Sequence, residues 1–156
     1  MKKLLLLFFL LAPGWVIAQT TAPTAGPTIN FCGLDLALTP GCTPESKYSV
    51  RCQDYQMTWM YLDYNMMRTF PEQFAQQIQK KHKHTERQPL DCFIMNSPSK
   101  GFRLSYPTEA GGMAYELIAY GVANGQPVMI QLTLATDPDK TADLPELPRQ
   151  IVRLSK

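Results

Sequence analysis

The sequence predicts an α+β domain: an antiparallel sheet of four to five strands, one amphipathic helix packed on one face, and a short C-terminal helix. Three observations lead to this prediction. Segments in which apolar and polar residues alternate recur between residues 48 and 134. A helical apolar repeat occupies residues 70–78, and an Asn-Gly dipeptide joins two of the alternating segments.

The first β-prone segment covers residues 48–62 and is rich in aromatic side chains. In its second half, Met57, Trp59 and Tyr61 alternate with Thr58, Met60 and Leu62. This pattern leads us to expect one or two strands here, and a helix around residues 61–68 is the alternative.

The main helix is predicted to start at Thr69-Phe70-Pro71-Glu72. Thr69 can cap a helix, Glu72 can return the capping hydrogen bond, and a proline suits a first turn because its missing amide needs no partner there. Phe70, Phe74 and Ile78 then recur on one helical face. We therefore expect a helix to about Lys81 that packs this aromatic stripe on a sheet.

The clearest hairpin signal is Asn124-Gly125, the dipeptide favoured in type I′ turns. A two-residue turn there pairs Ala119 with Ile130, Leu117 with Leu132 and Tyr115 with Leu134, and these apolar pairs should face the core. The opposite face would carry the pairs Tyr120 with Met129, Ile118 with Gln131, and Glu116 with Thr133.

Two further strands are expected on either side of a turn at residues 96–99, one through Leu90, Cys92 and Ile94 and one through Phe102, Leu104 and Tyr106. Near the C-terminus, Leu144, Leu147 and Ile151 have helical spacing. Because Pro148 removes an amide needed beyond a first turn, the helix is expected to start nearer Leu147, or the tail is a strand.

The N-terminus has the pattern of a secretory signal peptide over residues 1–18. Lys2 and Lys3 precede an apolar run at residues 4–12, which is too short to span a bilayer, and small residues at 16 and 18 precede a cleavage site. Residues 19–30 are then predicted to form a flexible Thr/Ala/Pro leader, and residues 31–156 one disulfide-bridged domain. We expect an exported protein, periplasmic or extracellular, with no membrane anchor after cleavage.

Charge gives little reason to expect a nucleic-acid partner. Of 15 Lys and Arg residues, Lys2 and Lys3 fall in the signal, and the remaining 13 balance the 13 Asp and Glu residues. A nucleic-acid-binding domain normally carries a basic stripe. The one basic cluster, residues 80–84, is interpreted as the solvated C-terminal turn of the helix.

The four cysteines are predicted to form two disulfides, because an even number in an exported chain is typical of a bridged framework. They are Cys32, Cys42, Cys52 and Cys92. We favour the pairing Cys32–Cys42 with Cys52–Cys92 among the three that are possible. No C-x-x-C pair supports a zinc site, so we expect no metal and no cofactor.

Known catalytic motifs do not occur in the sequence: there is no G-x-S-x-G, P-loop, H-E-x-x-H or glycine fingerprint. The two histidines, His82 and His84, lie in the most hydrophilic segment. We therefore expect a protein that is not an enzyme. An unrecognised hydrolase is kept as a further alternative.

A periplasmic Cu(I)-handling protein is the first alternative. Met57, Trp59 and Met60 place two thioethers beside an indole; thioethers select Cu(I), and an indole face can contact a cation. The competing interpretation is that these methionines fill the core, since strand alternation sends Met57 and Met60 to opposite faces.

The favoured hypothesis is a non-catalytic domain that binds a protein partner in the cell envelope, as an accessory factor or as an inhibitor or immunity-type protein. It rests on apolar and aromatic residue types that anchor interfaces. The candidate interface residues are Ile118, Tyr120, Met129, Trp59 and Tyr61. The alternative is that the C-terminal helix or the cysteine-rich loop covers these residues.

Overall fold

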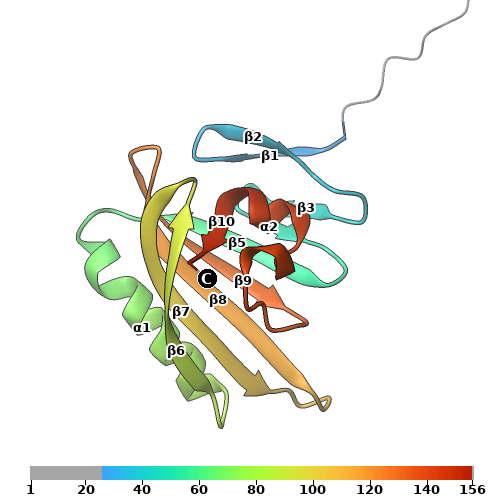
Figure 1. Cartoon of the computed structure of the whole chain (residues 1–156), viewed down its shortest axis with the longest axis vertical. Helices are drawn as coiled ribbons and strands as arrows, with labels where there is room; N and C mark the ends of the chain where they lie inside the picture. Colours follow the sequence, from blue (N-terminus) through green and yellow to red (C-terminus); the bar gives the residue numbers. More distant parts are fainter. Residues whose placement is uncertain (1–25, 156) are drawn as a thin grey trace, which may run out of the picture.

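The computed structural model describes residues 26–155, and it is mostly β (Figure 1). Eight strands form one curled antiparallel sheet, two more form a small second sheet, and one long helix is present in the described part of the chain. The prediction of an α+β domain with four to five strands is therefore wrong. The predicted signal peptide lies outside the described residues.

The large sheet has the strand order β10-β6-β7-β8-β9-β5-β4-β3. Its central strands are β6 (Glu86–Ile94), β7 (Ser97–Pro107), β8 (Met113–Ala123), β9 (Gln126–Leu134) and β5 (Tyr55–Tyr61). Short strands complete its edges: β3 (Thr43–Ser46), β4 (Ser49–Arg51) and β10 (Val152–Leu154). The small sheet pairs β1 (Thr28–Phe31) with β2 (Leu34–Ala37).

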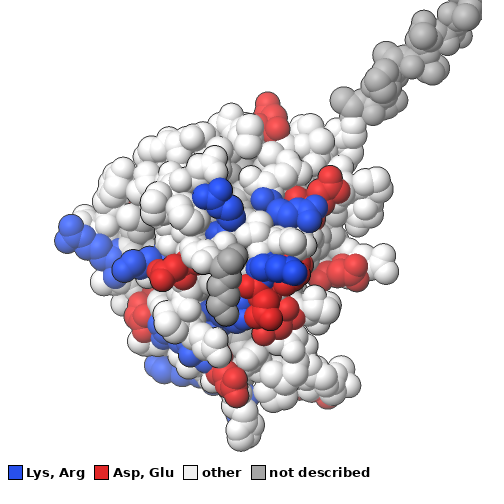
Figure 2. Space-filling model, in the orientation of Figure 1, with Lys and Arg blue, Asp and Glu red and all other residues white. Residues whose placement is uncertain are grey.

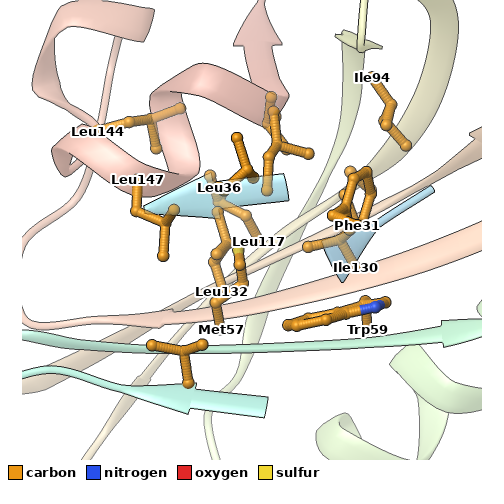
Figure 3. Packing of buried hydrophobic residues seen from close by; sticks show 14 of the residues in the cluster. Phe31, Leu36, Met57, Trp59, Ile94, Leu117, Ile130, Leu132, Leu144 and Leu147 are labelled. Atoms are coloured by element: carbon orange, nitrogen blue, oxygen red, sulfur yellow. The ribbon is translucent and has the colours of Figure 1, made fainter. Parts of the chain in front are cut away.

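One face of the curled sheet is filled by the larger core. Phe31 and Leu36 from the small sheet and Leu144 and Leu147 from the C-terminal segment pack with side chains of the large sheet (Figure 3). The residues they meet include Met57, Trp59, Leu117, Ile130 and Leu132. The β1–β2 hairpin is therefore fixed over the sheet by burial of its own apolar side chains.

The other face of the sheet is partly covered by α1 (Met66–Lys81). Phe70, Phe74 and Ile78 pack there with Ile118 and Met129, so the predicted apolar stripe is confirmed. The predicted start at Thr69 is wrong, because the helix begins at Met66, where the Met66 amide donates to the Asp63 carboxylate (2.7 Å). Pro71 therefore lies inside the helix.

The Asn124-Gly125 turn is confirmed together with its register. Ala119 pairs with Ile130, Leu117 with Leu132, and Tyr115 with Leu134. Asn124 and Gly125 both have positive φ (47° and 75°), as a type I′ turn requires.

The turn between β6 and β7 was predicted two residues too late. It consists of Met95 and Asn96, both with positive φ, and β7 continues to Pro107. Near the C-terminus, both suggested structures are present in succession: the six-residue α2 (Glu146–Ile151) is followed by β10.

The N-terminal part also differs from the prediction. Residues 28–30 were assigned to a flexible leader, but they belong to β1, and two further short strands, β2 and β3, follow before residue 47. β1 alternates between exposed and buried residues over only four positions, and all four residues of β3 are exposed.

The strong curl of the sheet requires glycine at one central position. A Cβ on Gly101 would lie 1.9 Å from the carbonyl oxygen of Ile118 on the neighbouring strand. The backbones of β7 and β8 therefore approach so closely that no larger residue fits.

None of the helices between residues 26 and 155 is long and apolar enough to cross a bilayer. Side chains of both signs lie close together on the face shown in Figure 2.

Candidate functional site

Exposed aromatic side chains gather where four turns of the chain meet. Tyr48 lies in the β3–β4 turn and contacts Tyr61 at the end of β5, with ring centroids 5.8 Å apart. Tyr64 follows in the connection to α1. These tyrosines are 38%, 37% and 59% exposed, which is unusual enough for large side chains to mark this end of the molecule as a candidate surface.

Hydrogen bonds tie these turns to one another. The Cys32 amide in the β1–β2 turn donates to the Tyr61 hydroxyl (2.9 Å), and the Asn124 side chain in the β8–β9 turn donates to the Cys32 carbonyl (3.0 Å). The Tyr64 hydroxyl donates to the Gly125 carbonyl (3.5 Å). The tips of both hairpins therefore lie side by side at this end (Figure 1).

A groove of about 640 Å³ opens beside these tyrosines. One wall is β1, and the other is β3 with the turn that follows it; Tyr61 lies between them. The lining residues are Thr28, Ile29, Asn30, Pro44, Ser46, Lys47, Tyr48 and Tyr61. We refer to this feature as the tyrosine groove.

The β1 wall presents a strand edge that pairs with no other strand between residues 26 and 155. Cys32 and Gly33, both with positive φ, form a two-residue turn, so Phe31 and Leu34 are a hydrogen-bonded pair. The hydrogen bond from the Leu38 amide to the Pro27 carbonyl (2.9 Å) belongs to the same ladder, two hydrogen-bonded pairs further from the turn. Antiparallel pairs alternate, so the amide and carbonyl of Thr28 and of Asn30 point away from β2.

The next residue whose backbone faces outward on this edge is Cys32, and Tyr61 and Asn124 are its hydrogen-bond partners. The amide of Cys32 is bonded to Tyr61 and its carbonyl to Asn124, as described above. Thr28 and Asn30 have no such partners among the described residues. The open part of the edge is thus limited to the two residues that line the tyrosine groove.

Trp59 lies behind the wall of the groove. Its ring packs edge-on against Tyr48, 6.2 Å between centroids, and against Phe31 on the core side. Trp59 is 1% exposed, and its Nε1 has no hydrogen-bond partner within the described part of the chain. An unsatisfied buried donor is rare in a folded protein.

One charge borders the tyrosine groove. Of the eight lining residues, Lys47 alone is ionised at neutral pH, and its ammonium lies 5.1 Å from the centroid of the Tyr48 ring. The groove therefore combines hydroxyl, amide and aromatic groups with a single positive charge.

The predicted interface residues are separated by the structure. Ile118 and Met129 are buried (0% and 2% exposed) beneath α1, and Tyr120 is half-buried beside Phe102. The expected surface on that face of the hairpin is therefore filled by the main helix. Of the five predicted residues, Tyr61 is the one that is exposed and lines the groove.

The proposed copper ligands do not converge. Met57 and Trp59 belong to the larger core, whereas Met60 packs on the opposite face of the sheet near α1. No cluster of three His, Cys, Asp or Glu side chains suited to a metal occurs between residues 26 and 155.

The cysteine pairing also differs from the prediction. Cys42 is bonded to Cys52, and Cys32 and Cys92 are free and buried. The favoured pairing, Cys32–Cys42 with Cys52–Cys92, is wrong because Cys32 lies at the tip of β1–β2 and Cys92 within β6. One disulfide remains consistent with an exported protein.

A buried carboxylate on the α1 face is a second polar feature that the sequence did not reveal. Glu116 is 5% exposed and accepts hydrogen bonds from the Tyr106 hydroxyl and from the Gln131 amide (2.7 Å). Burial and the Glu116 charge raise the pKa of Tyr106 well above its usual range. Since both carboxylate oxygens have donors, we interpret this cluster as structural.

Of the two histidines, His82 contacts this cluster. His82 stacks on the ring of Tyr106 (3.8 Å between centroids), and His84 is exposed with positive φ in the turn after α1.

Comparison with known proteins gives no family for this chain. No protein-family model matches the sequence, and no curated protein is detectably similar to it.

Tyr61→Phe should lower the free energy of unfolding by about 1–2 kcal/mol, because it leaves the buried Cys32 amide without its acceptor. Tyr48→Phe is the matched control: Tyr48 is equally exposed and its hydroxyl has no hydrogen-bond partner among the described residues. Urea unfolding of the two variants checks this. Equal losses of stability would show that the Tyr61 hydroxyl does not hold the hairpin.

Cys32 and Cys92 should resist alkylation in the folded protein and react in denaturant. Burial raises the pKa of Cys92 to about 12, with a smaller contribution from Asp91, and burial also raises the pKa of Cys32. At pH 8 both groups are therefore thiols rather than reactive thiolates. After iodoacetamide treatment, mass spectrometry should find Cys42 and Cys52 modified only in samples that were first reduced. It should find Cys32 and Cys92 modified only in samples that were denatured. A bridge that includes Cys32 or Cys92 would contradict this assignment.

Proposed function

We propose that this protein is a non-catalytic binding domain of the cell envelope that engages a protein partner through the tyrosine groove and the exposed tyrosines around it. The observation that carries the proposal is the groove: exposed Tyr48 and Tyr61 stand beside an unpaired strand edge. Tyrosine is enriched in protein interfaces because it contributes a large rigid contact area and a hydrogen-bonding tip.

The site is more suited to binding than to catalysis. A catalytic site needs a nucleophile or an acid–base pair held within a cleft. The groove contains hydroxyls of Thr28, Ser46, Tyr48 and Tyr61, but the groups that line it include no histidine, carboxylate or cysteine thiol to activate one. Catalysis is therefore not what this arrangement of side chains favours.

The role within the envelope is that of an accessory factor, or of an inhibitor or immunity-type protein. Export is supported by the signal-peptide pattern of residues 1–18 and by the Cys42–Cys52 bridge. A small domain with balanced charge and an aromatic binding surface suits either role, because in both it acts by occupying a surface of its partner.

Photo-crosslinking in the cells that export the protein tests this proposal. A benzophenone amino acid in place of Tyr48 or of Tyr64 should link the same partner protein, since Tyr48 lines the groove and the exposed Tyr64 lies at the same end of the molecule, on the β8–β9 turn. Met113 is the control position, because it is similarly exposed (45%) but lies at the opposite end of β8 from the Asn124-Gly125 turn.

Two outcomes separate the candidate roles and the proposal as a whole. A crosslinked hydrolase or toxin that loses activity when bound indicates an inhibitor or immunity-type protein, and a crosslinked envelope assembly component indicates an accessory factor. Crosslinks that are equal at all three positions, or absent at Tyr48 and Tyr64, would refute binding through this surface.

A further inference from the structure

The occupant of the tyrosine groove can be inferred from the groups that line it. We propose that the groove binds an extended peptide segment of the partner, uncharged or acidic, which adds to the small sheet as a third strand along β1. This inference rests on the proposed function, because it specifies how the same surface recognises its partner.

Backbone geometry is the first argument. Thr28 and Asn30 direct two amides and two carbonyls away from β2, and both residues line the groove. A strand added to an open edge uses such groups for main-chain hydrogen bonds. The open stretch of β1 ends at Cys32, whose amide is bonded to the Tyr61 hydroxyl and whose carbonyl is bonded to the Asn124 side chain. A peptide segment of about four residues has the length of this open stretch.

The opposite wall provides side-chain contacts rather than a second ladder. Pro44 on β3 has no amide to donate, and Ser46 uses its hydroxyl to accept from the Tyr48 amide (3.1 Å). The rings of Tyr48 and Tyr61 form an aromatic surface against which one side chain of the peptide can pack. Main-chain bonds to β1 and an aromatic contact thus come from different walls.

Charge sets the peptide class. Lys47 is the one ionised side chain that lines the groove. A basic peptide would bring like charges together, whereas an acidic residue near Lys47 gains an attraction.

The part of β6 that extends beyond β10 is a second strand edge and illustrates the contrast. The carbonyl of Asp91 on β6 accepts from the Ser155 amide (3.2 Å), so Asp91, Pro89 and Arg87 face outward on that edge. Pro89 has no amide and Arg87 is charged, and both features discourage strand addition. On the β1 edge, Thr28 and Asn30 are neither prolines nor charged residues.

Selection from a library of random octapeptides on the purified full-length protein should yield binders enriched in Asp or Glu and poor in Lys and Arg. Two N-methylated copies of the strongest binder are then synthesised. One carries N-methyl groups at its odd-numbered residues and the other at its even-numbered residues, and these are the two phases. Alternate amides of a β-strand face the same neighbour, so one phase should abolish binding and the other should leave it within about twofold. Equal effects of the two phases would overturn strand addition without the need for any protein variant.

A matched pair of proline substitutions locates the edge. Thr28→Pro removes an outward amide of β1 inside the groove, and Ala37→Pro removes the outward amide of its cross-strand partner on β2. Both leave the β1–β2 ladder unbroken. Thr28→Pro should weaken peptide binding about tenfold or more, whereas Ala37→Pro should change it less than about twofold.

Charge reversal tests the peptide class. Lys47→Glu should lower affinity for the selected acidic peptide at low salt, and Lys83→Glu, in the turn after α1, should not. Equal effects of the two reversals would overturn the role of Lys47.

The remaining outcomes also decide between occupants. Absence of peptide binders, with crosslinks at Tyr48 and Tyr64 intact, would overturn this inference and leave the proposed function standing. Absence of both would remove the two together. A dimer in sedimentation that Thr28→Pro converts to monomers would show that a second copy fills the groove, contrary to the proposal.

Discussion

The backbone of β1 is the constraint on which this account depends. A strand has two edges, and every amide and carbonyl on each edge needs a partner or water. Burial of Ile29, Phe31 and Leu36 fixes the hairpin over the core, so the chain cannot rotate to hide its outer edge. On this outer edge the Cys32 amide has a hydrogen-bond partner, whereas the backbone groups of Thr28 and Asn30 are left open. The tyrosine groove lies along the open residues.

The curled sheet converts this local feature into a site. Its curl brings β5 and the β8–β9 turn beneath the tip of β1–β2, where Tyr61 and Asn124 reach the Cys32 backbone. Close approach of β7 and β8 at Gly101 is part of the same curl. The core that holds the sheet together therefore also determines which part of the β1 edge faces solvent.

The sequence predicted the features whose causes are local. Asn124-Gly125 determines a turn type and hence a register, and the spacing of Phe70, Phe74 and Ile78 marks a helical face. The strand count was wrong because β3 is exposed along its length and residues 28–30 were assigned to the Thr/Ala/Pro leader that precedes them. The site was predictable only as far as Tyr61, since the roles of Thr28 and Asn30 come from pairing with β2. The covered positions Ile118 and Met129 could not be recognised without knowing where α1 packs.

Amide hydrogen exchange of β1, followed by NMR in the free protein and with bound partner or peptide, tests the central claim most directly. We expect fast exchange at Thr28 and Asn30 in the free protein, slow exchange at Ile29, and protection of Thr28 and Asn30 on binding. Asp35 and Ala37, on the far edge of β2, should exchange quickly in both states. Protection of Thr28 and Asn30 before binding, or no gain of protection after it, would contradict the account.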